Sequence, residues 1–245
     1  MEYMEYILYN KINIKCYTND YISSIIYKYK CWEPNITLFF NYLLKNKKDN
    51  IIFDIGCNIG YFSLISSQYC KKIYAFDANI ENINLLNESI QINKINNINT
   101  YNYAINDNNN DIFKLKIINK ENIGAHRVDK ISNNNNNNNN NNINNNNNNN
   151  NDTASIKSCV LDDFITINDI NHIDLMKIDI EGFELACLNG LKNTLTTDII
   201  KNIIIEITPL WDIDIAKYIL FILKNNNYTI YNIGLNETGE YIEIF

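Results

Sequence analysis

Short apolar runs of β-forming residues alternate with helical stretches along most of this 245-residue chain. Ile51–Asp54 predicts a fully buried strand, and residues 71–77 predict a second strand. A helix is expected after each of them, at about 61–70 and at 79–93. Strands that alternate with helices are typical of a mostly parallel sheet with helices on both faces. The sequence therefore predicts an α/β fold.

The second half of the chain repeats this alternation. Two further strands are expected at residues 172–180 and 201–207. Each is followed by a helix, at 183–195 and at 214–226. Residues 228–234 and 240–245 are expected to pair as a terminal antiparallel hairpin. The whole pattern predicts a mostly parallel, seven-stranded sheet that includes this hairpin.

A single domain is expected over residues 1–245, because 46% hydrophobic content suffices for one substantial core. Residues 1–50 would form an N-terminal cap with a helix at 36–45, and its many tyrosines are expected to pack within the cap rather than bind a partner. The core would comprise residues 51–131 and 152–245.

The core is interrupted at residues 132–151 by an insert that is almost entirely asparagine. Residues 133–151 contain one other residue, Ile143. Amides without apolar neighbours cannot offset the entropy of ordering the chain, so a disordered surface loop is predicted. Recruitment into aggregates or condensates is an alternative role for such a segment.

Composition and charge argue against several classes of function. The net charge of −7 and the pI of about 4.9 disfavour nucleic acid as a partner. No run of about 18 apolar residues is present, so no membrane span is expected. The six cysteines form no CxxC pair, and the N-terminus has acids where a signal peptide needs basic residues. We expect a cytoplasmic protein with reduced thiols.

Acidic residues end four of the predicted strands. They are Asp54, Asp77, Asp179 and Glu206. In open α/β sheets the ligand lies beyond the carboxyl ends of the strands, where the strand order reverses. We therefore expect these side chains to gather in one ligand site.

The turn after the first strand indicates which ligand fits. Gly56 and Gly60 would let the backbone approach a ligand and turn sharply into a helix. The spacing does not match the dinucleotide fingerprint G-x-G-x-x-G, and the Asp54 carboxylate would repel a pyrophosphate. S-adenosylmethionine carries an ammonium and a sulfonium and no phosphate, so an acid attracts it. A tight structural turn with a capping Asp or Asn is the alternative.

Asp77 follows Asp54 by 23 positions, at the end of the second strand. An acid in this place can accept both hydroxyls of a ribose diol. Asp77 can also cap the helix that starts near Asn79, and the two roles are compatible.

A second group of acids lies in residues 177–184, KIDIEGFE. Alternation along the strand places Lys177, Asp179 and Glu181 on one side. An attacking alcohol needs a base, and a carboxylate in a closed site can have its pKa raised for that purpose. Asp179 and Glu181 are therefore candidate catalytic residues, whereas Glu184 can equally start the next helix.

Two further candidates are weaker. His126 lies in a loop beside the insert, and an imidazole pKa suits a base. A divalent metal at Asp179 and Glu206 would need a third acid, so no metal is assigned.

These segments resemble the FkbM-type methyltransferase family. The resemblance runs from about Trp32 to Pro209 and rests on DIGCNIGYFSL (54–64), AFDANIENINLL (75–86), LDDFI (161–165), LMKIDIEGFELACLNGLKNTL (175–195) and IIIEI (203–207). The family implies a Rossmann-like class I methyltransferase fold, S-adenosylmethionine as cofactor, and hydroxyls of sugars, glycolipids or secondary metabolites as acceptors.

The resemblance also implies roles for individual residues. The residues expected to line the cofactor are Asp54, Gly56, Asn58, Gly60, Asp77 and Asp179, with Glu33 of the WEP segment closing over it. Asp179, Glu181 and Glu206 would border the methyl-transfer centre.

The sequence thus favours an S-adenosylmethionine-dependent O-methyltransferase that acts on a small-molecule or glycan hydroxyl. A binding or scaffold protein that keeps this fold without catalysis is the alternative, because a fold alone does not secure an activity. The residues do not choose among possible acceptors or oligomeric states.

Overall fold

A computed structural model describes residues 3–116, 127–131, 155–208, 212–235 and 241–243 of the chain. The predicted disordered insert and His126 lie outside these residues. Within the described ranges, no helix combines the length and the apolar character needed to cross a bilayer.

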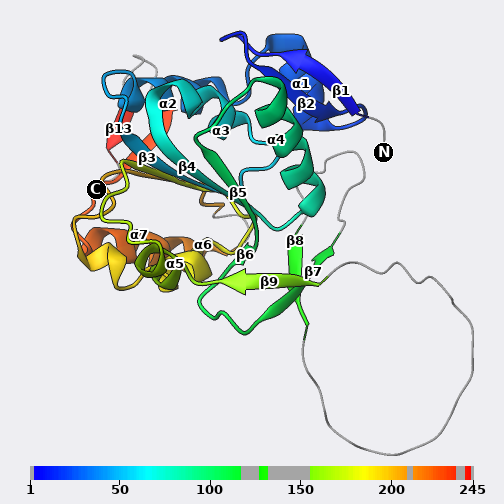
Figure 1. The fold of residues 1–245 in the computed structure, drawn as a ribbon. Coiled ribbons are helices and arrows are strands. Elements are labelled where there is room, and N and C mark those ends of the chain that lie inside the picture. Colours follow the sequence, from blue (N-terminus) through cyan, green and yellow to red (C-terminus); the bar gives the residue numbers. More distant parts are fainter. Residues whose placement is uncertain (1–2, 117–126, 132–154, 209–211, 236–240, 244–245) are drawn as a thin grey trace, which may run out of the picture.

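Five parallel strands form the central sheet (Figure 1). Across the sheet they are β11 (Ile203–Ile205), β10 (Leu175–Ile178), β3 (Asn50–Ile55), β4 (Cys70–Asp77) and β5 (Ile98–Asn102). Read from β5, these are the third, second, first, fourth and fifth strands along the chain, so the order reverses between β3 and β10. This is the doubly wound arrangement, whose ligand crevice opens at the reversal.

Helices cover both faces of this sheet, and each layer buries one apolar cluster (Figure 1). One layer consists of α2 (Pro34–Leu44), α3 (Tyr61–Ser66) and α4 (Ile80–Ile92), with a 3₁₀ turn at Ser67–Tyr69. The other consists of α5 (Leu161–Ile167), α6 (Glu184–Asn189) and α7 (Ile213–Asn225), with a 3₁₀ turn at Thr194–Thr196. Because the central strands are covered on both sides, β3 is nearly continuous in buried residues.

The N-terminal residues form a small unit against the first helical layer. It consists of the antiparallel hairpin β1 (Tyr3–Ile7) and β2 (Asn13–Tyr17), followed by α1 (Tyr21–Tyr29). Strand β2 is attached to α4, since the Lys15 N–H donates to Ser89 Oγ at 2.9 Å and the Asn13 N–H donates to Asn93 Oδ1 at 2.9 Å.

A second sheet lies beside the carboxyl end of β5. Its order is β6 (Ala104–Ile105), β9 (Ile156–Cys159), β7 (Ile112–Lys116) and β8 (Arg127–Lys130). Strands β7 and β8 are antiparallel neighbours. Strands β7 and β9 therefore belong to this sheet and not to the central one.

The central sheet has five strands in the described part of the chain, where the sequence predicts seven. Strands β12 (Tyr231–Leu235) and β13 (Tyr241–Glu243) pair antiparallel with each other and form a separate two-stranded sheet there. Alternation of residue types predicts that a segment is extended, but it does not specify the edge with which that segment pairs.

Candidate active site

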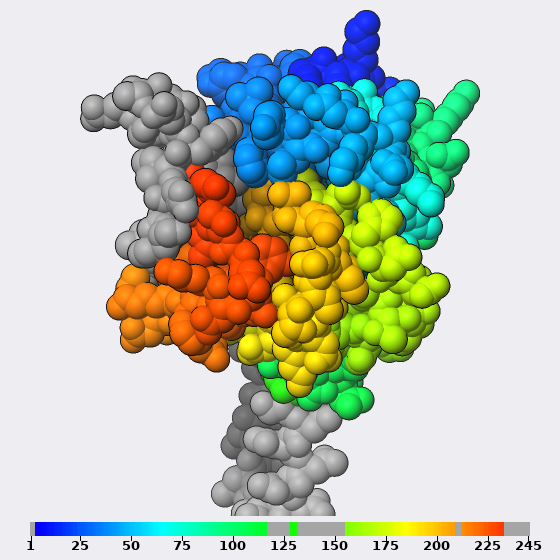
Figure 2. Space-filling model, turned by 90° about the vertical axis from the view of Figure 1, so that its left-hand side faces the viewer, coloured from blue at the N-terminus to red at the C-terminus, as the bar shows by residue number. Residues whose placement is uncertain are grey.

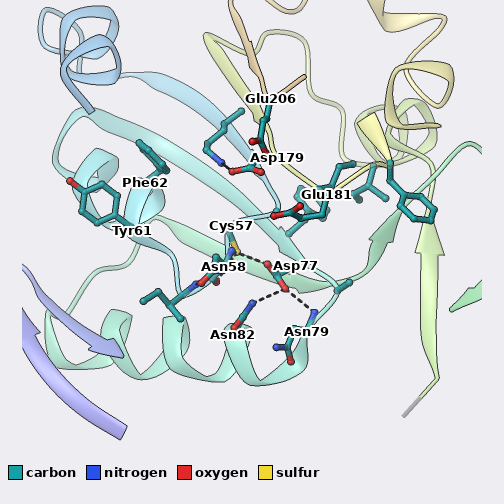
Figure 3. A pocket seen from close by; sticks show the side chains of 18 of the residues that line it. Cys57, Asn58, Tyr61, Phe62, Asp77, Asn79, Asn82, Asp179, Glu181 and Glu206 are labelled. Atoms are coloured by element: carbon teal, nitrogen blue, oxygen red, sulfur yellow. Dashed lines mark hydrogen bonds and ion pairs between the residues drawn. The ribbon is translucent and has the colours of Figure 1, made fainter. Parts of the chain in front are cut away.

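A cavity lies at the carboxyl ends of the central strands, where the strand order reverses (Figure 3). Asp77 lies on one side of it, and Asp179, Glu181 and Glu206 lie on the other. These acids come from three strand ends because parallel strands deliver their carboxyl ends to the same edge of a sheet.

The glycine turn between β3 and α3 forms the floor of the cavity. Gly56 has φ +78°, and a Cβ added to it would lie 1.8 Å from the backbone oxygen of Asp179. Gly60 has φ +84°, and a Cβ added to it would lie 2.2 Å from the Leu86 side chain. Gly56 lines the cavity and Gly60 does not. Both glycines therefore permit close packing within the protein itself.

Asp54 lies beneath this floor. Its side chain is fully buried and does not line the cavity. Ser63 Oγ donates to Asp54 Oδ2 at 2.6 Å, whereas Oδ1 has no hydrogen-bond partner among the described residues. Burial raises the pKa of Asp54, and the Lys177 ammonium and the Ser63 hydrogen bond oppose that rise. A direct contact between Asp54 and a cofactor stays a prediction.

Asp77 connects the glycine turn to α4 through uncharged donors (Figure 3). Its Oδ2 accepts from the Asn58 N–H at 2.8 Å, and its Oδ1 accepts from the Asn79 N–H at 2.8 Å and Asn82 Nδ2 at 3.2 Å. Burial raises the pKa of Asp77 to about 6 although these donors lower it. Asn58, with φ +51°, and Asp77 both line the cavity.

On the side of the cavity opposite Asp77, Lys177 forms an ion pair. Its Nζ lies 2.7 Å from Asp179 Oδ2 and 5.1 Å from the centroid of the Phe62 ring. Burial lowers the pKa of Lys177, but the carboxylates of Asp179 and Asp54 raise it above its usual value. Burial likewise opposes ionisation of Asp179, yet the Lys177 ammonium holds the pKa of that carboxyl below its usual value. The pair therefore joins a buried ammonium to a partly buried carboxylate.

Glu206 lies beside this pair at the end of β11. The residue as a whole is exposed, and it lines the cavity. Burial of its carboxyl group, a hydrogen bond to Asp179 and the charge on Asp179 raise the pKa of Glu206 to about 8. Two carboxyl groups at one site thus have different tendencies to hold a proton.

The loop after β10 presents Glu181. Glu181 and Gly182 have φ +53° and +103°, and the buried Glu184 supports them from the first turn of α6. The Glu184 carboxylate accepts from the Gly182 N–H at 3.0 Å and from the Ile180 N–H at 3.2 Å. Of the two predicted roles for Glu184, the contacts favour the structural one.

Glu33 reaches the cavity from the N-terminal side. It precedes α2 in a left-handed conformation with φ +42°, and it lines the cavity together with Trp32 and Tyr21. The two aromatic rings meet edge to face with centroids 6.2 Å apart. Burial raises the pKa of Glu33.

Carboxylates therefore dominate this site. Six of them, Glu33, Asp54, Asp77, Asp179, Glu181 and Glu206, line the cavity or lie directly beneath it, and Lys177 is the ammonium among them in the described residues. Such a site favours a cationic ligand and disfavours a phosphate.

Three of these acids also have the spacing of metal ligands. One oxygen from each of Asp179, Glu181 and Glu206 can lie within 4.8 Å of the others. Lys177 already places one positive charge 2.7 Å from Asp179.

The structure places most of the predicted site residues together. Those that line the cavity are Glu33, Gly56, Asn58, Asp77, Asp179, Glu181 and Glu206. Asp54 and Gly60 lie outside its wall, and His126 lies outside the described residues. Sequence reasoning assigned no role to Lys177, although a lysine in the buried strand LMKI was a signal of a charged partner.

Aromatic and aliphatic side chains of the cavity were also missed. They include Tyr61, Phe62, Tyr103, Leu115, Val128 and Phe183. Leu115 and Val128 come from the second sheet, so no pattern local to the strand-end motifs indicates them.

The strand order, the glycine turn and the strand-end acids define a Rossmann-like methyltransferase fold. The Methyltransferase FkbM domain matches residues 54–230. This chain belongs to the FkbM methyltransferase family. No curated protein matches its sequence.

The solved structures that match this chain do so at low sequence identity. The Methyltransferase FkbM from Methylobacillus flagellatus is 19% identical with a TM-score of 0.48, over 84% of this chain and 45% of that one. A precorrin 8w decarboxylase from Methanobacterium thermoautotrophicum is 14% identical with a TM-score of 0.43, over 85% and 83%. TYW2 of M. jannaschii in complex with AdoMet is 22% identical with a TM-score of 0.30, over 40% and 42%. This chain thus spans less than half of the Methylobacillus protein and of TYW2.

Proposed function

We propose that this chain transfers a methyl group from S-adenosylmethionine to a hydroxyl of a sugar, a glycolipid or another small metabolite. The observation that carries the proposal is the carboxylate-dominated cavity at the reversal of strand order, with Lys177 as its described ammonium. A donor with a sulfonium and an ammonium and no phosphate suits that charge.

Asp77 suits the ribose of such a donor. An ionised carboxylate offers about four lone-pair positions, and the three described donors to Asp77 fill three of them. One position, on Oδ2, remains for a ligand hydroxyl. We therefore expect Asp77 to accept one strong hydrogen bond from a ribose, not the two suggested by its position in the sequence.

Asp179 and Glu206 suit the acceptor. S-adenosylmethionine, when bound, supplies a methyl group that is electrophilic because it is attached to a sulfonium. An acceptor hydroxyl loses its proton on attack, and a carboxylate whose pKa is raised above neutrality is a stronger base for it. We assign removal of the acceptor's proton to Glu206. Asp179, which Lys177 keeps ionised, would orient the Glu206 carboxyl group.

Calorimetric titration tests the cofactor. S-adenosylmethionine and S-adenosylhomocysteine are expected to bind with micromolar dissociation constants, whereas NADH is not expected to bind. Saturable binding of NADH, or no heat from either nucleoside, would contradict the proposal.

The acceptor needs a separate experiment. Incubation with isotopically labelled S-adenosylmethionine and a panel of sugars and glycolipids, followed by mass spectrometry, should reveal one added methyl group on a hydroxyl oxygen. Methyl addition to nitrogen or carbon would overturn the O-methyl assignment. Cofactor binding without transfer to any acceptor would favour the scaffold alternative.

A further inference from the structure

The N-terminal unit and helix α2 together carry a cluster of exposed tyrosines and lysines. The cluster lies at the helix ends that do not line the cavity. We call it the Tyr–Lys face and define it by Tyr9, Tyr27, Lys28, Lys30, Tyr42 and Lys45. Its three tyrosines are 45%, 58% and 66% exposed. The N-terminal part of the chain, in blue, forms one end of the molecule in Figure 2.

These residues are contiguous although they come from three elements. Asn41 Nδ2 of α2 donates to Tyr9 Oη at 2.9 Å, and the Tyr9 N–H donates to the Lys30 backbone oxygen at 3.2 Å. The Lys30 ammonium lies 5.0 Å from the centroid of the Tyr27 ring. The turn of the hairpin thus joins the end of α1 to the outer side of α2.

Two more lysine–tyrosine contacts lie on this face or directly beside it. Lys45 Nζ lies 5.5 Å from the ring centroid of Tyr42, and Lys28 Nζ lies 4.9 Å from that of Tyr29. Leu38, one turn before Tyr42 on α2, is 63% exposed. The face therefore combines amphipathic rings, an aliphatic side chain and ammonium groups.

The charge of this region is opposite to that of the whole chain. Residues 20–49 contain five lysines and three acids, Asp20, Glu33 and Asp49, whereas the chain has a net charge of −7. Glu33 lines the cavity at the other end of α2, and Asp20 is buried at the start of α1. Glu5 of the hairpin is paired with Lys15 at 3.7 Å, beside α4. The face is thus a basic surface on an acidic protein.

We infer that the Tyr–Lys face docks on an anionic lipid bilayer. Tyrosine rings favour the headgroup level, where the apolar body is buried and the hydroxyl stays wet. Lysines near an anionic surface are attracted to it, and this explains their concentration here. Tyr17 is buried, in line with packing inside the cap, whereas Tyr9, Tyr27 and Tyr42 are exposed.

Docking in this orientation would place the cavity near the membrane. Helix α1 starts at Tyr21 and α2 follows Glu33, both of which line the cavity, and both helices end at the Tyr–Lys face. Helices of 9 and 11 residues span about 14–17 Å. The docking proposal does not depend on the identity of the donor or of the acceptor.

Vesicle co-sedimentation tests the inference with the full chain. Binding is expected to vesicles of phosphatidylcholine with phosphatidylserine, to weaken with salt, and to be much lower on phosphatidylcholine alone. Each lysine contributes about fivefold, so the triple variant Lys28→Gln, Lys30→Gln, Lys45→Gln should lose about 100-fold. Tyr27→Ser with Tyr42→Ser should weaken binding and leave its salt dependence unchanged.

A matched control removes the same charge from the other helical layer. Lys192→Gln, Lys217→Gln and Lys224→Gln together should leave vesicle binding unchanged. Equal loss in both triple variants, or equal binding to both lipid mixtures, would overturn the inference. So would sedimentation equilibrium showing a dimer that the tyrosine variant dissociates, because the face would then bind a second copy. Circular dichroism confirms that each variant is folded.

Discussion

The two sides of the cavity support their acids in different ways. Asp77 accepts hydrogen bonds from two backbone N–H groups and one amide, all uncharged, and its pKa is raised to about 6. Asp179, at the equivalent end of β10, is paired with the Lys177 ammonium at 2.7 Å, and its pKa is lowered. Similar positions at two strand ends therefore provide one carboxylate held by dipoles and one held by charge.

This difference suggests a division of work. In the proposed function, the neutral donors would orient Asp77 toward a ligand hydroxyl, which is a binding role. The ion pair keeps Asp179 ionised beside Glu206 and separates the proton affinities of two neighbouring carboxyl groups, which is an arrangement suited to proton transfer. Changes on the Asp77 side should affect donor affinity, and changes on the Asp179 side should affect turnover.

The largest effect is expected from Lys177→Met. Removing the ammonium leaves the buried Asp54 and the partly buried Asp179 without their cation, and loss of one partner of a buried pair costs about 3–5 kcal/mol in the free energy of unfolding. Urea denaturation at neutral pH measures it. Lys217→Met, which removes an exposed i,i+3 pair, should change it by less than about 0.5 kcal/mol.

The stability difference between wild type and Lys177→Met should depend on pH with a defined sign. The pKa of Asp179 is lowered in the folded protein, so its pairing stabilises the fold above the usual aspartate pKa of about 3.9. This stabilisation is lost as pH falls through the folded pKa. The gap between wild type and Lys177→Met should therefore narrow in acid, and a gap that widened there would contradict the ion-pair account.

Glu206→Gln should lower kcat by about 10²–10⁴-fold, the usual contribution of a general base, with donor affinity unchanged. Because the pKa of Glu206 is raised to about 8, wild-type kcat should rise with pH toward a plateau above that value. The variant should lose this rising limb. A variant that kept the limb would assign the base elsewhere.

On the other side of the cavity, Asp77→Asn should weaken the donor by roughly 10–100-fold, since a hydrogen bond to a charged group contributes about 1.5–3 kcal/mol. Turnover at saturating donor should stay near the wild-type value. Calorimetry and kcat measurements together separate the two effects. Glu88→Gln, on the exposed side of the adjacent helix α4, serves as the control and should change neither donor affinity nor turnover.

The smallest effect is expected from Gly60→Ala. The left-handed φ of +84° costs an alanine about 1–2 kcal/mol, and the neighbouring Leu86 side chain must shift. Because Gly60 does not line the cavity, donor affinity and kcat should be unchanged while thermal stability falls. A loss of donor affinity larger than the loss of stability would restore the cofactor-binding role suggested by the sequence.

Local patterns in the sequence were sufficient for much of the core. The acids at the ends of β4, β10 and β11 were predicted to share one site because strand alternation identifies the strands and parallel order collects their carboxyl ends. The same reasoning could not separate Asp54, which is buried under the floor, from Asp77, which faces the cavity. Both end a strand, and only the packing around the turn distinguishes them.

Long-range pairing accounts for what the sequence could not indicate. Lys177 acquires Asp54 as a neighbour from the adjacent strand, since the two residues are level across the β10–β3 register. The second sheet brings Leu115 and Val128 to the cavity from segments separated by residues 117–126. Neither relation leaves a periodic signal in one stretch of sequence.

The central claim is that the Asp77 side binds the donor and the Asp179 side performs the transfer. Calorimetric titration of S-adenosylhomocysteine into wild type, Asp77→Asn and Glu206→Gln tests it most directly. The account predicts micromolar binding by wild type, clear weakening in Asp77→Asn and unchanged affinity in Glu206→Gln. Equal affinity loss in both variants, or no binding by wild type, would contradict it.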